Sequence, residues 1–311
     1  MSNQKYVGVW PVMLTPFDER KEIDWASLEK LVEWYLAAGV HGLFADCQSS
    51  EMFFLSDDEA RRLVRFIVEK VDGRVPVVAS GHTATAFDHQ REQVAGMAET
   101  GVDGVIFISN RLALAGESDE AALEALKLLT AAVPERVDLG IYECPYPYKR
   151  LLSDETVAWC AQSGRYAFIK DTCCDINIIK RRLALCEGSR LHLANANSQT
   201  LLASFQAGCQ AFSGVMANFH PELYVWLYEH WQNEPEKAQR LSDYLSTAAL
   251  IEHVDYPVCA KYFQQSVGNF RTIACRVRNS GGFTQTFFPQ ATDAMVRLGQ
   301  DVKSALKLYP K

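Results

Sequence analysis

A lysine closes a stretch of the chain that is otherwise aromatic and aliphatic. The run RYAFIKDTCCD covers residues 165–175, and its lysine is Lys170. Apolar surroundings destabilise the charged form of an amine and lower its pKa from about 10.4 toward neutrality. A neutral amine can attack a ketone and form an iminium, which accepts electrons from the neighbouring carbon. Lys170 is therefore a candidate Schiff-base residue. In the alternative interpretations, its amine reaches out to solvent or pairs with Asp171 or Asp175.

A tyrosine offers the proton transfer that such chemistry needs. Tyr142 lies in the run DLGIYE, residues 138–143. Its phenol could carry protons to and from a carbinolamine and the departing oxygen. Packing of the ring in the core is the alternative interpretation of this residue.

The segment CQSSE, residues 47–51, is a candidate carboxylate-binding loop. It combines small residues, hydroxyls and backbone N–H groups, and a turn of this kind can hold an anion. Gln48, Ser49 and Ser50 are its candidate substrate-binding residues. Glu51 fits better as a brace, with its carboxylate accepting backbone N–H bonds.

Eight short apolar runs are predicted to be the strands that position these residues. Most contain two or more consecutive apolar residues, as parallel strands buried on both faces require. They cover residues 7–14, 41–46, 75–80, 104–109, 138–143, 166–170, 190–194 and 211–216.

Helical patterns separate the strands. The segment 25–39 has apolar residues on one helix face and ends at a glycine, and the segment from Ser56 opens with a capping box. Ser153 is a plausible N-cap for a third helix. Eight strands, each followed by a helix, predict an α/β fold of the (β/α)8 TIM-barrel type. An open doubly wound sheet is the alternative, but the first turn lacks its glycines.

The barrel topology would bring Tyr142 and Lys170 together, because both end neighbouring strands at the face where barrels carry their active sites. After about residue 232 the strand pattern stops and helical patterns follow. We expect residues 1–232 to form the barrel with the active site. Residues 233–311 would form a C-terminal helical extension packed on it.

Composition excludes several other classes. The 311 residues carry a net charge of −7 without long basic runs, so no nucleic-acid partner is expected. No apolar stretch reaches the roughly 18–20 residues of a membrane span, and the polar start does not resemble a signal peptide. We therefore expect a cytoplasmic protein. The nine cysteines lack C-x-x-C spacing and should be reduced thiols. The histidines lack ligand spacing and no dinucleotide or P-loop motif occurs, so no metal or cofactor is expected.

An ordered set of segments resembles a known family. It comprises LTPFDERKEIDWASLEKLVEWYLAAGVHGLF, CQSSE followed by LSDDE, GRVPVVASG, the strand ending in Tyr142 with a proline three residues later, FIKDTCCD and GCQAFSGVMANFHP. In this order, over residues 7–222, the chain resembles the dihydrodipicolinate synthase / N-acetylneuraminate lyase superfamily. The resemblance implies a class I lyase for pyruvate or a longer 2-oxo acid. Lys170 would form the Schiff base, and Tyr142 would act as acid and base.

The resemblance also assigns binding roles. Ser49 matches the second threonine of the family's G-T-T-G-E loop, which binds the 2-oxo acid's carboxylate, and Gln48 replaces the first. Ser213 matches a position that meets the 2-oxo acid through its backbone carbonyl. The family further implies a homo-oligomer, either a tetramer or a dimer.

Two departures from the family pattern concern the part of the site that the synthases use for their second substrate. Leu112 stands where the synthases have a proton-relay tyrosine, and Pro147 stands where they have an arginine for the second substrate. These two losses argue against dihydrodipicolinate synthesis. Arg111 is the candidate for a distal anionic or hydroxyl group, and Asn195, with Asn197, could reach a polyhydroxyl tail.

We therefore expect a Schiff-base lyase that acts on pyruvate or a 2-oxo-3-deoxy sugar-acid-like substrate. Reversible aldol cleavage and dehydration both stay open, because they share the iminium. The alternatives are a catalytically weak 2-oxo acid binding or regulatory member of the family, and a true dihydrodipicolinate synthase, which is disfavoured. An enzyme that needs flavin or metal has no motif to support it.

Overall fold

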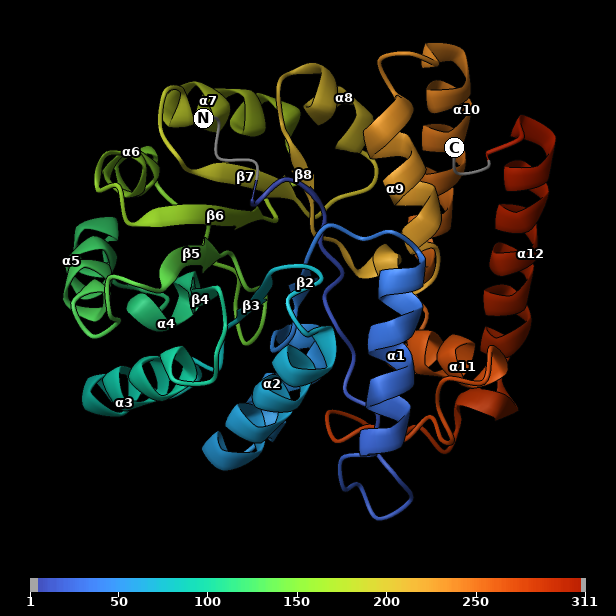
Figure 1. Cartoon of the computed structure of the whole chain (residues 1–311), viewed down its shortest axis with the longest axis horizontal. Helices are drawn as coiled ribbons and strands as arrows, with labels where there is room; N and C mark the ends of the chain where they lie inside the picture. The colour runs from blue at the N-terminus through green and yellow to red at the C-terminus, as the bar shows by residue number, and fades with distance from the viewer. Residues whose placement is uncertain (1–4, 309–311) are drawn as a thin grey trace.

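Eight parallel strands form one curled sheet in the computed structural model, which describes residues 5–308 (Figure 1). The strand order is β1-β8-β7-β6-β5-β4-β3-β2, and a parallel bridge between Val12 and Phe44 closes the ring between the first and second strands. This arrangement is a TIM barrel and excludes the doubly wound alternative. The strands are β1 (Gly8–Val9), β2 (Leu43–Phe44), β3 (Val77–Ala79), β4 (Gly104–Ile108), β5 (Asp138–Tyr142), β6 (Tyr166–Asp171), β7 (His192–Asn195) and β8 (Ala211–Phe212).

All eight predicted strands are confirmed, although several are shorter than predicted. The largest difference concerns the first run, predicted over 7–14 and observed as Gly8–Val9. Pro11 has no N–H group to donate to a neighbouring strand, which interrupts regular pairing there. Beyond it, contact with the second strand is limited to the Val12–Phe44 bridge and the backbone bonds that flank it.

Helices follow the strands and cover the outside of the sheet (Figure 1). The predicted N-caps are confirmed: Ser56 and Ser153 each accept a hydrogen bond from a first-turn N–H, and Ser56 forms the capping box with Glu59. The helices are α1 (Trp25–Ala37), α2 (Asp57–Val71), α3 (Phe87–Ala98), α4 (Ser109–Leu112), α5 (Asp119–Thr130), α6 (Asp154–Gln162), α7 (Ile176–Cys186), α8 (Leu201–Gln206) and α9 (Pro221–His230).

The C-terminal part is helical, as predicted. It contains α10 (Pro235–Ala248), the 3-10 turn η4 (Ala249–His253), α11 (Val258–Ser266), the 3-10 turn η5 (Phe283–Gln285) and α12 (Phe288–Leu306). These elements lie together beside α1 and α9, on one side of the barrel (Figure 1). The division at residues 232 and 233 stays our proposal.

The barrel interior is filled by its own apolar cluster, which includes Trp10, Phe44, Ile106, Tyr142 and Phe168. A second, larger cluster fills the layer between the strands and the helices. The described cysteines are all free thiols, and all of them except Cys173 and Cys174 are buried. Within residues 5–308, we find no helix with the length and apolar character needed to cross a membrane.

Candidate active site

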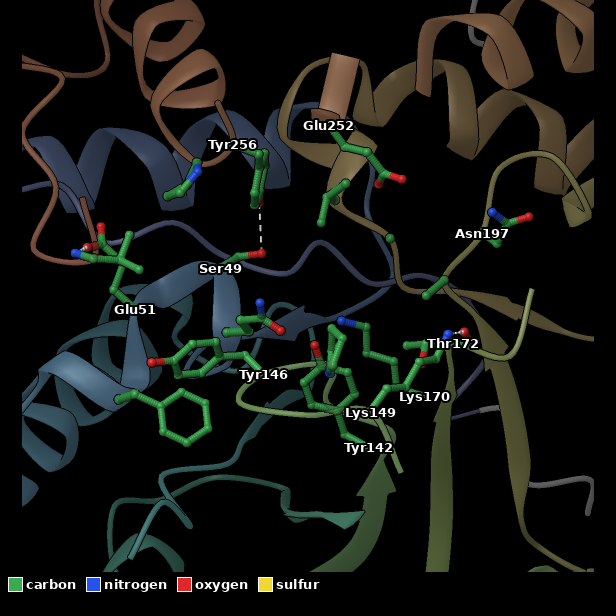
Figure 2. Close-up of a pocket in the computed structure, with 18 of the residues that line it drawn as sticks. Ser49, Glu51, Tyr142, Tyr146, Lys149, Lys170, Thr172, Asn197, Glu252 and Tyr256 are labelled. Carbon is green, nitrogen blue, oxygen red and sulfur yellow. Dashed lines mark hydrogen bonds between the residues drawn. The ribbon is translucent and has the colours of Figure 1, made fainter. Parts of the chain in front are cut away.

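Lys170 and Tyr142 stand opposite each other at the carboxyl ends of two paired strands. The register of β5 and β6 places Tyr142 beside Lys170. The Lys170 Nζ atom lies 4.0 Å from the centroid of the Tyr142 ring and 5.7 Å from that of Phe44. Figure 2 shows the amine pointing into the pocket above the tyrosine ring. The prediction that the barrel brings these two side chains together is confirmed.

Burial determines the charge state of the lysine. Its side chain is 3% exposed, so it does not reach out to solvent. Asp171 bonds to Arg182, and Asp175 caps α7, so neither serves as its ion-pair partner. Loss of hydration lowers the pKa of Lys170 to about 8, although the nearby thiols of Cys47 and Cys144 raise it slightly. A substantial fraction of the amine is therefore neutral near physiological pH.

The tyrosine keeps its proton. Burial raises the pKa of Tyr142 well above its usual value, and the thiols of Cys144 and Cys47 act in the same direction. A neutral phenol next to a neutral amine can donate a proton to an oxygen that leaves a carbinolamine, and can take the proton back later.

A cavity of about 700 Å3 opens above this pair. Its walls come from the strand ends, from the loop after β2, from the loop after β5 and from the C-terminal part. The residues that line it include Gln48, Ser49, Glu51, Phe53, Tyr142, Tyr146, Lys149, Lys170, Thr172, Asn197, Gly214, Glu252, His253, Tyr256 and Arg278. The last four were not predicted from the sequence, because no local pattern indicates that the C-terminal part reaches the barrel mouth.

Some residues of the loop after β2 face the cavity and others face the core. Gln48 and Ser49 line the cavity, as the sequence predicts. Ser50 does not: its hydroxyl bonds to the carbonyl oxygens of Met13 and Ala45 and accepts from the Cys47 N–H. The prediction that Ser50 binds substrate is therefore wrong for its side chain, because the 3-10 turn over 48–50 directs its hydroxyl to the segments that follow β1 and β2.

Glu51 braces the loop, as predicted, but its partners belong to the C-terminal part. Its buried carboxylate pairs with Lys261 and accepts N–H bonds from Arg276 and Val277. These contacts hold a left-handed backbone conformation, with φ 62°, which a residue with a Cβ rarely adopts. The bond from Glu51 thus ties the loop to the helical extension.

Arg111 does not line the main cavity. The carbon of its guanidinium lies 5.2 Å from the ring centroid of Phe53, and the residue lines a separate cavity of about 150 Å3 with Gln90 and Tyr148. The predicted contact of Arg111 with a distal substrate group stays a prediction. Residues 109–112 form the short helix α4, so this arginine packs on Phe53 instead of facing the lysine.

The prediction that the Asn195 side chain contacts substrate is also wrong, while the prediction for Ser213 stays open. Asn195 is fully buried, and its amide bonds to the hydroxyls of Thr200 and Ser204. It holds the end of β7, and Asn197 lines the cavity in its place. Ser213 is buried, and its neighbour in the sequence, Gly214, lines the cavity. Its predicted contact through the backbone carbonyl stays a prediction.

A buried ion triad joins β5 and β6, the strands that carry Tyr142 and Lys170. Arg182 of α7 donates to Glu143 at 2.6 Å and to Asp171, residues that directly follow Tyr142 and Lys170. Its side chain is 1% exposed and both carboxylates are fully buried. Glu143 therefore has a structural role. Arg182 was not predicted, because the helical pattern around it is typical of a solvent-facing position.

Removing this arginine should destabilise the fold strongly. We expect Arg182→Met to lower the free energy of unfolding by about 3–5 kcal/mol, because it leaves two buried carboxylates without their partner. Chemical denaturation with a tryptophan signal measures the change. The matched control is Arg136→Met, whose pair with Glu99 is 61% exposed on both sides; it should change stability by less than about 0.5 kcal/mol. Equal effects of the two substitutions would contradict the assigned role.

Fold and site together define a class of enzyme: a TIM barrel whose sixth strand presents a desolvated lysine beside a tyrosine of the fifth is a Schiff-base lyase of the aldolase type. The model of the dihydrodipicolinate synthetase family matches residues 5–281, and the chain belongs to this family. The resemblance found in the sequence is thereby confirmed.

Individual relatives agree with this assignment. A 4-hydroxy-tetrahydrodipicolinate synthase from Methanopyrus kandleri is 28% identical over 239 residues, which cover 75% of this chain and 77% of the relative. An uncharacterised DapA-like lyase from Halobacterium salinarum is 29% identical over 247 residues, covering 78% and 79%. The solved structure of YagE from E. coli K12, in complex with pyruvate, superposes with a TM-score of 0.83 at 20% identity, covering 96% of this chain and 99% of that one.

Proposed function

We propose that this protein is a class I lyase that forms a Schiff base between Lys170 and pyruvate or a 2-oxo-3-deoxy sugar-acid-like substrate. The reaction is reversible aldol cleavage or dehydration. One observation carries the proposal: a desolvated amine lies 4.0 Å from the ring of a buried tyrosine in a cavity of about 700 Å3. The pyruvate complex described for the similar structure YagE supports the choice of a 2-oxo acid.

The reaction begins at the ketone carbon of the substrate. The Lys170 nitrogen attacks this carbon, the carbonyl oxygen takes a proton from Tyr142, and the resulting carbinolamine loses water to give the iminium. When the hydroxyl on C4 of the substrate loses its proton, the C3–C4 bond breaks. Its electron pair moves into the iminium at C2 to give an enamine, and C4 leaves as an aldehyde. In dehydration a proton leaves C3 instead, and hydroxide departs from C4. Protonation and hydrolysis then free the amine.

Polar side chains elsewhere in the cavity favour a hydroxylated substrate over dihydrodipicolinate synthesis. Lys149, Asn197, Glu252 and His253 line the wall and offer donors and acceptors of both charge signs. Leu112 is buried and has no hydroxyl to relay protons. We further propose that the iminium serves as electron sink without a cofactor. We also propose that the protein is cytoplasmic and that it forms a homo-oligomer, a tetramer or a dimer.

A panel of 2-oxo acids tests this proposal. Pyruvate alone should exchange its methyl protons with deuterium in the presence of the protein, because iminium and enamine interconvert. Proton NMR measures this exchange. The protein should cleave or dehydrate at least one member of a set of 2-oxo-3-deoxy sugar acids. Thermal stabilisation by pyruvate without exchange or turnover would instead support the binding-only alternative.

The pH dependence follows from the lowered pKa of the lysine. Only the neutral amine attacks, so the rate of pyruvate exchange should rise about tenfold per pH unit below the pKa. It should level off near pH 8, where Lys170 loses its proton. Initial exchange rates measured over a pH series at constant ionic strength give the profile. A rise that continues up to about pH 10.5, the ordinary range of lysine, would contradict the assigned environment.

A further inference from the structure

A tyrosine of the C-terminal part donates a hydrogen bond to the candidate carboxylate-binding loop. The hydroxyl of Tyr256 donates to the Oγ atom of Ser49 at 2.7 Å, across 207 residues of sequence (Figure 2). Both residues line the main cavity. Tyr256 lies between η4 and α11, so this bond joins the helical extension to the loop after β2. Sequence patterns gave no sign of it.

The direction of this bond is fixed by a carbonyl group in the core. The carbonyl of Val12 can only accept, and it accepts from the Asn218 Nδ2 atom at 3.0 Å. The same Nδ2 atom donates to the Tyr256 oxygen at 3.0 Å. The amide oxygen of Asn218 consequently faces Tyr35, whose hydroxyl donates to it. Because the Tyr256 oxygen already accepts from Asn218, its single proton is directed to Ser49.

The Ser49 hydroxyl is therefore oriented as a donor. Its oxygen accepts the proton of Tyr256, so its own proton has to point in another direction. Ser49 is 4% exposed and lines the cavity that holds the lysine. The N–H groups of Ser50 and Glu51 already bond within the loop, so they do not compete for a ligand. Aligned hydrogen bonds also polarise one another, which strengthens the terminal donor.

We propose that Tyr256 is a positioning residue that orients the Ser49 hydroxyl as a donor to the carboxylate of the bound 2-oxo acid. The inference rests on the proposed function, because it takes the ligand of the cavity to be a 2-oxo acid. The fully buried Asn218 anchors this series of hydrogen bonds at its end in the core. Burial raises the pKa of Tyr256 well above its usual value, so the phenol keeps the proton that it donates.

The test compares a charged ketone with an uncharged one. Borohydride trapping is measured on the full chain at increasing concentrations of pyruvate or of methyl pyruvate, which has an ester in place of the carboxylate. In Tyr256→Phe, half-saturation by pyruvate should move to about tenfold higher concentration, as the loss of an oriented donor to a charged group predicts. Half-saturation by methyl pyruvate should change less than about twofold. Ser49→Ala should give the same loss of selectivity.

Further variants separate positioning from damage. In the double variant, pyruvate binding should be no weaker than in Ser49→Ala alone, because both substitutions act through one hydroxyl. Ser49→Thr keeps a hydroxyl and should restore most of the selectivity. The matched control is Tyr224→Phe. Tyr224 is a buried phenol whose hydroxyl bonds to that of Ser198 outside the cavity, so its loss should leave half-saturation by both ketones unchanged.

Two results would overturn the inference. One is an equal weakening of the binding of both ketones by Tyr256→Phe, which would indicate a general structural role. The other is unchanged pyruvate selectivity in both Tyr256→Phe and Ser49→Ala. Failure of the proposed function looks different, because the unmodified protein would then trap neither ketone.

Discussion

Replacing Lys170 with methionine is expected to reduce pyruvate methyl exchange by at least about 10⁴-fold, to the background rate without protein. The substitution removes the nucleophile but keeps most of the buried aliphatic chain. Because burial already disfavours the charged amine, its loss should leave the free energy of unfolding unchanged or slightly higher. Proton NMR of pyruvate in deuterated buffer gives the exchange rate, and chemical denaturation gives the stability.

Lys149→Met is the matched control for this loss. Lys149 lines the same cavity, but its amine bonds to the Thr172 carbonyl instead of facing the tyrosine ring. Exchange should persist in this variant at a measurable rate. Full exchange activity in Lys170→Met, or equal loss in both variants, would place the reacting amine elsewhere.

Tyr142→Phe should have the second largest effect, a reduction of pyruvate exchange by about 10²–10⁴-fold, the usual contribution of a positioned acid and base. The phenylalanine ring retains the apolar contacts with Phe44 and Lys170. Only the hydroxyl that moves protons is lost, so iminium formation becomes slow without becoming impossible. Single-turnover trapping with borohydride should therefore reach the same final extent at a much lower rate.

A second buried tyrosine provides the comparison. Tyr166→Phe removes a hydroxyl that bonds to Thr130 on the outer side of the barrel. It should change exchange by less than about twofold, since it does not touch the cavity. If Tyr142→Phe behaves like Tyr166→Phe, the proton transfer depends on another group.

The fold and the proximity of Tyr142 and Lys170 could be predicted because their signals are local. Each strand carries its own apolar run, and the capping residues Ser56 and Ser153 stand at the start of their helices. Once eight strands alternate with helices, barrel geometry places Tyr142 beside Lys170 without further information. The observed register of β5 and β6 pairs Tyr142 with Lys170, as this geometry predicts.

The rest of the site depends on contacts between segments far apart in the sequence. Arg182 looks like a surface residue of α7, yet it is buried between two carboxylates that only the folded strands bring to it. Tyr256 reaches Ser49 from the helical extension, where no spacing pattern indicates a site. Arg111 was assigned to the cavity by its position after a strand, but the helical turn of α4 places it against Phe53.

The central claim is that the Lys170 amine condenses with a 2-oxo acid. Peptide mass spectrometry after reduction with borohydride in the presence of pyruvate tests it most directly. The account predicts that the mass of a reduced pyruvyl group appears on Lys170, and that no other lysine, Lys149 included, carries it in significant amount. An adduct on a different lysine, or an unmodified Lys170 under conditions in which pyruvate methyl protons exchange, would contradict the account.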